Sequence, residues 1–281
     1  MHGLLPYHTD DDVKGSCTKK MIRRVLAQHF LLDREILHRI ILAADLSRND
    51  TVIEVGSGRG VVTRELVKKA GHVVAIEVDS ELARNLSGRL GHPPNLTVLE
   101  GDARTIDLDQ TMCKAGSFKV VGNLPYYAAN PIIRRFLEAY TKPALMVVMV
   151  QKEVAEAMVA APGKMRIISV GVQFYGVPRI VCIVPPVAFK PVPKVSSAVM
   201  RIDLLPQPSV QVDNVAQFFS LVQAGFIAPR KQLRNSLAMG LGLSSKVVEN
   251  LLERCQIVPQ RRPETLTLEE WACLYRSRQD V

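Results

Sequence analysis

The chain has 281 residues, 47% of them hydrophobic and 22% charged, and its 36 Lys and Arg against 27 Asp and Glu give a net charge of +9. This length is enough for one large hydrophobic core and a smaller second unit, and the positive charge favours polyanionic partners, nucleic acid before an anionic membrane. The sequence has no long apolar stretch, no CxxC pair among its five cysteines and no cluster of histidines, so we expect a cytoplasmic protein in a reducing compartment, without a transmembrane helix, disulfide framework or metal site.

The first half of the chain predicts alternating strands and helices. Residues 1–20 are polar and are expected to form a flexible lead-in, and apolar residues then recur at helical spacing over 33–44. Strands are predicted over 51–55, 72–77, 96–100, 119–122 and 144–151, with helices over 61–70 and 132–140. Such alternation is typical of a parallel sheet with crossover helices.

The second half of the chain changes to a helical pattern. A helix is predicted over 152–161, and the apolar runs 167–174 and 195–204 are interpreted as strands on either side of a proline-rich segment, 184–194. Beyond a linker at 206–208, helices are predicted over 218–228, 230–239, 244–256 and 267–276. The expected fold is an α/β domain over 21–205, with a doubly wound sheet and helices on both faces, followed by a small all-helical domain over 209–281.

A glycine-rich turn follows the first predicted strand of the sheet. Gly56, Gly58 and Gly60 lie where a buried strand passes into a helix, and glycines let the backbone approach a ligand closely. Glu77 follows Gly56 by 21 residues, at the end of the next strand, where an acidic residue typically binds ribose hydroxyls. Because Val61 stands where a dinucleotide fingerprint has glycine, we expect a nucleoside cofactor without phosphates. The alternative is a purely structural turn.

Two further strand ends carry polar groups. Asp102 ends the third strand and is suited to accept a hydrogen bond from an adenine amine, or else to cap the following turn. The run Asn123-Leu124-Pro125-Tyr126 ends the fourth strand, and it is either a plain turn or a site that grips an exocyclic amine beside an aromatic face. Ligands of open α/β sheets bind at the carboxyl ends of the strands, so one site is favoured over chance placement of four groups.

The order of these motifs resembles that of class I S-adenosylmethionine-dependent methyltransferases with a Rossmann-like sheet, specifically the ribosomal RNA adenine N6,N6-dimethyltransferases. Supporting stretches lie at 27–33, 151–155, 185–199, 230–237 and 262–266, so the resemblance spans nearly all of residues 23–276. It implies that S-adenosylmethionine is the cofactor. The cofactor-binding residues that it implies are His29, Leu31, Gly56, Gly58, Glu77, Asp102 and Asn123.

The resemblance also implies roles for the substrate-binding residues. The catalytic residues are Asn123, Leu124, Pro125 and Tyr126, with the Asn123 side-chain oxygen and the Leu124 carbonyl accepting the two amine hydrogens. Tyr126 and Phe189 are expected to stack on the target adenine, although a buried core position is the alternative for Phe189. Basic residues expected to hold RNA phosphates, or otherwise to form solvated faces, are Lys19, Lys20, Arg23, Arg24, Lys194, Arg230, Lys231 and Arg234.

The function implied by this resemblance is dimethylation of two adjacent adenines in a loop near the 3′ end of small-subunit ribosomal RNA, with a role in small-subunit biogenesis. The partner is then ribosomal RNA or a pre-assembled small subunit, and a monomer is expected. Two alternatives stay open at this point. One is a large-subunit adenine dimethyltransferase that confers antibiotic resistance, and the other is a non-enzymatic assembly or transcription factor on the same fold.

Overall fold

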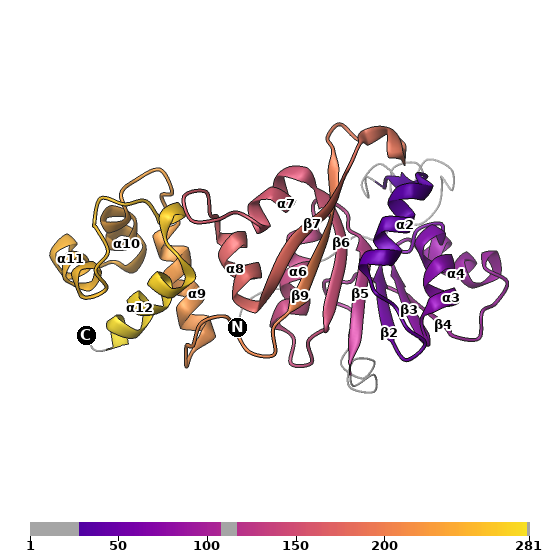
Figure 1. The fold of residues 1–281 in the computed structure, drawn as a ribbon, viewed down its shortest axis with the longest axis horizontal. Coiled ribbons are helices and arrows are strands. Elements are labelled where there is room, and N and C mark those ends of the chain that lie inside the picture. Colours follow the sequence, from indigo (N-terminus) through magenta and orange to yellow (C-terminus); the bar gives the residue numbers. More distant parts are fainter. Residues whose placement is uncertain (1–27, 108–116, 280–281) are drawn as a thin grey trace, which may run out of the picture.

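The computed structural model describes residues 28–107 and 117–279 of the chain (Figure 1). Its centre is a seven-stranded sheet in the order β4-β3-β2-β5-β6-β9-β7, in which the first five strands run parallel and the last two pair antiparallel. The strands are β2 (Thr51–Val55), β3 (His72–Glu77), β4 (Leu96–Glu100), β5 (Phe118–Asn123), β6 (Leu145–Gln151), β7 (Gly176–Val184) and β9 (Ser197–Leu204). The chain order reverses between β2 and β5, which is the point where open α/β sheets bind ligands.

A separate two-stranded ribbon lies beside the sheet. It pairs β1 (Phe30–Leu31) antiparallel with β8 (Phe189–Lys190), so that Leu31 is opposite Phe189. The backbone N–H of Leu32 adds a bond of 2.8 Å to the Ala188 carbonyl. The ribbon therefore fixes the segment before the first helix against the end of the proline-rich loop.

Helices cover both faces of the sheet, as predicted. On one face, α2 (Arg34–Ala43) and α3 (Val61–Lys69) pack in a core that also contains Leu31 and Phe189. On the other face, α6 (Ala129–Glu138), α7 (Lys152–Met158) and α8 (Ile167–Tyr175) pack in the larger core. The helix α4 (Ser80–Arg89) was not predicted; Asp79 caps it by accepting the N–H groups of Glu81 and Leu82.

Four helices, α9 (Val215–Gly225), α10 (Leu233–Leu241), α11 (Ser245–Arg254) and α12 (Leu268–Gln279), gather at the end of the molecule away from α2 and α3 (Figure 1). Trp271 of α12 is fully buried among them and stacks on Phe226. The rings of Phe174 in α8 and Phe218 in α9 stack with centroids 5.1 Å apart, which joins these helices to the sheet. The predicted C-terminal helices are confirmed, with ends shifted by a few residues.

The prediction of a strand over 167–174 is wrong, because this run forms the helix α8. A short apolar run has the same pattern in a buried helix and in a buried strand, and α8 is covered by both the sheet and α9. The strand β7, which was missed, begins directly after it. Pro178 lies within β7 and weakens the strand signal, but β7 is the edge of the sheet, where proline is tolerated.

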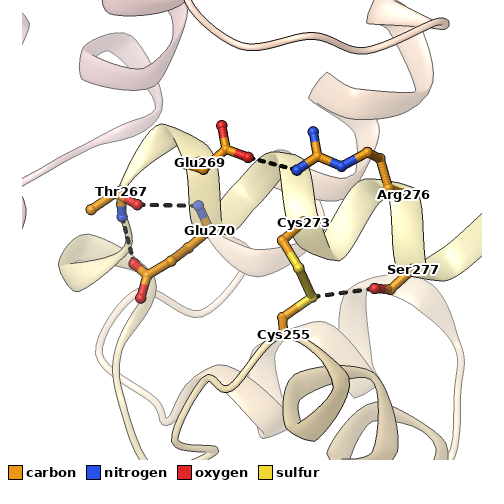
Figure 2. The surroundings of a disulfide bond; sticks show 7 residues. All are labelled: Cys255, Thr267, Glu269, Glu270, Cys273, Arg276 and Ser277. Atoms are coloured by element: carbon orange, nitrogen blue, oxygen red, sulfur yellow. Dashed lines mark hydrogen bonds and ion pairs between the residues drawn. A yellow bond between two sulfur atoms is a disulfide. The ribbon is translucent and has the colours of Figure 1, made fainter.

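The prediction that the cysteines form no disulfide is also wrong. Cys255, which follows α11, pairs with Cys273 of α12, with Cα atoms 5.9 Å apart (Figure 2). Eighteen residues separate the two cysteines in sequence, and only the packing of α11 against α12 brings them together. In the described residues, no helix combines the length and the apolar character that a membrane crossing needs.

Candidate active site at the carboxyl ends of the strands

A pocket opens where the parallel strands β2, β3, β4 and β5 end. The segments that follow these four strands all line it, as the sequence predicted, and residues 28–30 and Phe189 close it from the side of the ribbon. Predicted residues in its lining are His29, Gly56, Gly58, Glu77, Asp102, Asn123, Leu124, Pro125, Tyr126 and Phe189.

The glycine-rich turn brings the ends of β2 and β5 together. Gly56 has a positive φ of 76°, and a Cβ at this position would lie 3.0 Å from the carbonyl oxygen of Asn123. A side chain at position 56 would therefore strain the turn and press on the end of β5. The glycine leaves a bare backbone surface in the pocket wall, which is what a closely packed ligand needs.

Glu77 presents a fixed carboxylate to the pocket. It is only 3% exposed, and its Oε2 and Oε1 accept the N–H groups of Gly58 at 2.7 Å and Asp79 at 3.0 Å. Burial raises the pKa of Glu77, and these backbone donors oppose that shift. Two donors orient the carboxylate before any ligand binds.

A second acidic side chain, Glu54, lies in β2 close to Glu77. It is 2% exposed, and its Oε2 has no hydrogen-bond partner among residues 28–107 and 117–279. Burial raises the pKa of Glu54 to about 8, and the charge of Glu77 shifts it in the same direction. Glu54 is therefore neutral below that pH.

Asp102 lines the same pocket as the glycine-rich turn and is held by Arg104. The guanidinium of Arg104 contacts both carboxylate oxygens, with Nη2 at 2.6 Å from Oδ2 and Nε at 3.1 Å from Oδ1. Hydrogen bonds from Arg104 hold the pKa of Asp102 below its usual value. Its Oδ1 also accepts the N–H of Arg104, so the turn-capping interpretation and a place in the pocket are both correct.

Hydrogen bonds fix the Asn123 side chain and its neighbours. Asn123 Nδ2 donates to the His29 carbonyl at 3.0 Å, so the amide oxygen is the acceptor atom of this side chain. His29 Nδ1 donates to the Pro191 carbonyl at 2.7 Å, and the Tyr126 hydroxyl bonds to Ser197 Oγ at 2.7 Å. The His29 and Tyr126 rings lie 5.9 Å apart.

Some predicted residues lie elsewhere. The side chain of Leu31 is buried in the α2–α3 core and does not line the pocket; Phe30 does. Phe189 lines the pocket, but it is only 3% exposed and sits in β8 within that same core. The alternative of a buried core position for Phe189 is therefore confirmed, and stacking on a target adenine stays a prediction.

Sequence reasoning missed several pocket residues. Gln28, Phe30, Val78 and Tyr127 line the pocket, and Ser197 holds Tyr126 from β9. Val78 could have been found, because it directly follows Glu77 at the end of a predicted strand. Ser197 belongs to a distant antiparallel strand, and no local pattern connects it to the pocket.

The predicted RNA-binding residues are only partly described. Lys19, Lys20, Arg23 and Arg24 lie outside the described residues. Lys194 is exposed in the loop before β9, and Arg230 and Lys231 are exposed in the loop before α10. Arg234 forms an ion pair of 2.8 Å with Glu249, so its charge is already partly neutralised.

The comparison with known families gives one long match. The family described as "Ribosomal RNA adenine dimethylase" matches this chain over residues 19–279. A ribosomal RNA small subunit methyltransferase A from Dehalococcoides mccartyi is 46% identical over 90% of this chain and 87% of that protein. A protein of the same name from Alkaliphilus metalliredigens is 40% identical over 94% of this chain and 97% of that protein.

Solved structures share the fold. The 23S rRNA methyltransferase ErmE is 28% identical, with a TM-score of 0.70 over 88% of this chain and 98% of that one. A dimethyladenosine transferase from Plasmodium falciparum is 24% identical, with a TM-score of 0.77 over 90% of this chain and 98% of that one. The strand order and the glycine-rich turn after β2 define a methyltransferase of the class I fold. Within that class, the chain belongs to the ribosomal RNA adenine dimethylase family.

Proposed function

We propose that the protein transfers methyl groups from S-adenosylmethionine to the N6 atoms of two adjacent adenines in a loop near the 3′ end of small-subunit ribosomal RNA. The observation that carries the reaction is the Asn123 amide, whose nitrogen is bonded to the His29 carbonyl and whose oxygen is left to accept. The choice of substrate is supported by the small-subunit methyltransferase that is 46% identical over 90% of the chain.

The pocket residues fit this cofactor. The two backbone donors on Glu77 hold a carboxylate where ribose hydroxyls would bind. Gly56 leaves bare backbone for the methionine part, because a Cβ there would meet the Asn123 carbonyl oxygen at 3.0 Å. Asp102 is the candidate acceptor for the adenine amine of the cofactor. When bound, the cofactor supplies an electrophilic methyl group on a sulfonium.

Asn123 and Leu124 would activate the target amine. Its lone pair is delocalised into the adenine ring, so it is a poor nucleophile. With the Asn123 amide oxygen accepting one hydrogen and the Leu124 carbonyl the other, the nitrogen becomes more tetrahedral and its lone pair leaves the ring plane. Good positioning alone can contribute roughly 7–11 kcal/mol, and the proton of the methylated amine can pass to water without a strong base.

Aromatic residues would hold the extruded base. Tyr126, with its hydroxyl fixed by Ser197, and Phe189 both line the pocket. Stacking of a base on an aromatic side chain is worth about 1–3 kcal/mol, and an enzyme acting on a base needs it unpaired or flipped out of its stack.

The C-terminal helices, residues 209–281, would form an RNA-binding unit. Arg230 and Lys231 are exposed in the loop before α10, where they are free to contact phosphates. We further propose that the protein works as a monomer in the cytoplasm during small-subunit biogenesis, on ribosomal RNA or a partly assembled subunit.

Two alternatives are weaker. Methylation of large-subunit RNA rests on ErmE, which at 28% identity is a more distant relative than the small-subunit enzymes. A non-enzymatic binding platform would not need Asn123 and Glu77 to be oriented by hydrogen bonds, so it leaves this arrangement unexplained.

The test is transfer of labelled methyl from S-adenosylmethionine to unmodified small subunits, unmodified large subunits and protein-free large-subunit RNA, with nucleoside analysis. Dimethyladenosine in small subunits alone is the expected result. Label confined to a large-subunit substrate would contradict it, and so would cofactor binding without any transfer.

A further inference from the structure

A second cavity, of about 450 Å³, adjoins the candidate active site. Its lining includes Gln28 and Phe30, which also line the first pocket, so both cavities border the segment before α2. Arg59, from the glycine-rich turn, and Arg89, at the end of α4, contribute positive charge to its wall. Pro191, which directly follows strand β8 of the ribbon, also lines this cavity.

The two arginines differ from their neighbours in charge pairing. Both are exposed, and in the part of the chain that the structure describes neither forms a salt bridge, whereas Arg84 of α4 pairs with Glu100 and Arg104 pairs with Asp102. The guanidinium of Arg59 lies over the Phe30 ring, 4.5 Å from its centroid. The cavity thus combines two uncompensated cations with an aromatic ring.

This combination suits a nucleotide. Guanidinium groups pair with phosphates, and flat bases stack on aromatic rings and on arginine planes. The volume lies within the roughly 300–1,000 Å³ of typical ligand sites. A small anion alone would use the cations but leave the apolar wall of Phe30 and Pro191 uncovered.

We infer that this cavity receives a nucleotide next to the target adenine, with its phosphate paired to Arg59 and Arg89 and its base against Phe30. The inference rests on the proposed function, because it assigns the neighbour of a base held at Tyr126 and Phe189. Occupation of both cavities by one RNA strand would place the backbone across the segment 28–30 and fix which adenine reaches Asn123.

The test measures RNA and cofactor binding separately. A labelled, unmodified RNA fragment containing the 3′ loop of the small-subunit RNA is titrated by fluorescence anisotropy at several salt concentrations, and S-adenosylhomocysteine is titrated by calorimetry. The variants are Arg89→Ala and Arg59→Ala, with Arg59→Lys to retain the charge. Arg59 packs on the Phe30 ring and Arg89 does not, so Arg89→Ala removes a charge without disturbing that ring. Arg84→Ala, on the same helix as Arg89 but outside the cavity, is the matched control.

We expect Arg89→Ala and Arg59→Ala each to weaken RNA binding about five- to tenfold and to reduce the salt slope by about one, with cofactor affinity unchanged. Arg59→Lys should recover most of the loss and Arg84→Ala should behave as wild type. Unchanged RNA affinity and salt slope in Arg89→Ala would overturn the inference. Loss of cofactor affinity instead, in both alanine variants, would assign the cavity to the cofactor and also overturn it. The RNA titration needs no turnover, so failure of wild-type methylation would count against the proposed function alone.

Discussion

Single residues in the pocket are held in place by side-chain and backbone partners before any ligand binds. Asn123 donates a hydrogen bond to the carbonyl of His29, just before β1, and the Tyr126 hydroxyl is hydrogen-bonded to Ser197 of β9. Both partners come from segments far away in the sequence. Orientation of these two side chains therefore depends on the tertiary fold, while the residue types themselves are evident in the chain.

Tyr126 offers a test of base stacking. Tyr126→Ala removes the ring and should lower kcat/KM for small subunits by roughly 5- to 150-fold, the equivalent of about 1–3 kcal/mol of stacking. Tyr126→Phe keeps the ring and loses only the hydrogen bond to Ser197, so its loss should be a few-fold at most. Steady-state rates of methyl transfer distinguish the two Tyr126 variants. Tyr140→Ala, at an almost fully exposed tyrosine, is the control. Equal losses in the two Tyr126 variants would exclude stacking as the main role.

Glu54 predicts a pH dependence of stability. Its pKa rises from 4.5 in the unfolded chain to about 8 in the fold, so the folded state binds the extra proton between these values. The contribution of Glu54 to the free energy of unfolding is therefore fully present below about pH 4.5, and it is lost as the pH rises through that window. Glu54→Gln cannot ionise. In urea unfolding, wild type should become progressively less stable than Glu54→Gln from about pH 5 to about pH 8. A difference that does not vary with pH would refute this assignment.

The helices α9 and α10 pack closely enough that a glycine is needed between them. A Cβ on Gly240 of α10 would lie 2.5 Å from Ala224 Cα and 2.6 Å from its carbonyl oxygen, and neither backbone atom can move aside. Gly240→Ala should therefore destabilise the protein by about 1–3 kcal/mol. The matched control is Gly171→Ala in α8, where a Cβ meets nothing within 4 Å and about 0.4–1 kcal/mol of stabilisation is expected. Urea unfolding of both variants checks this, and equal effects would contradict it.

The disulfide between α11 and α12 gives a second prediction at this scale (Figure 2). It closes a segment with a sequence separation of 18, so its loss in Cys273→Ala should lower the free energy of unfolding by about 2–4 kcal/mol in the absence of reductant. Cys182→Ala removes a free thiol in β7 and serves as control. Adding reductant should bring wild type to the level of Cys273→Ala. No difference between wild type and Cys273→Ala without reductant would show that the bond does not form.

Across the whole molecule, the sequence allows the parallel half of the sheet and its ligand-binding edge to be predicted. Short buried strands, glycines and acidic strand ends are local signals, and they placed Gly56, Glu77, Asp102 and Asn123 in one pocket correctly. The helix α8 and the pair Cys255–Cys273 were not predictable, because burial on two sides and the packing of distant helices decide them. The same holds for the second cavity, which residues from four separate segments line.

The central claim is that Asn123 activates an adenine amine of the small subunit for methylation. Its most direct test is a side-by-side measurement of methyl transfer to unmodified small subunits and of S-adenosylhomocysteine binding, for wild type and Asn123→Ala, with the exposed Asn85→Ala as control. We predict that Asn123→Ala loses at least about 10²-fold in kcat while its affinity for the ligand changes little, because the loss lies in positioning the amine. Turnover by Asn123→Ala at the wild-type rate would contradict the account.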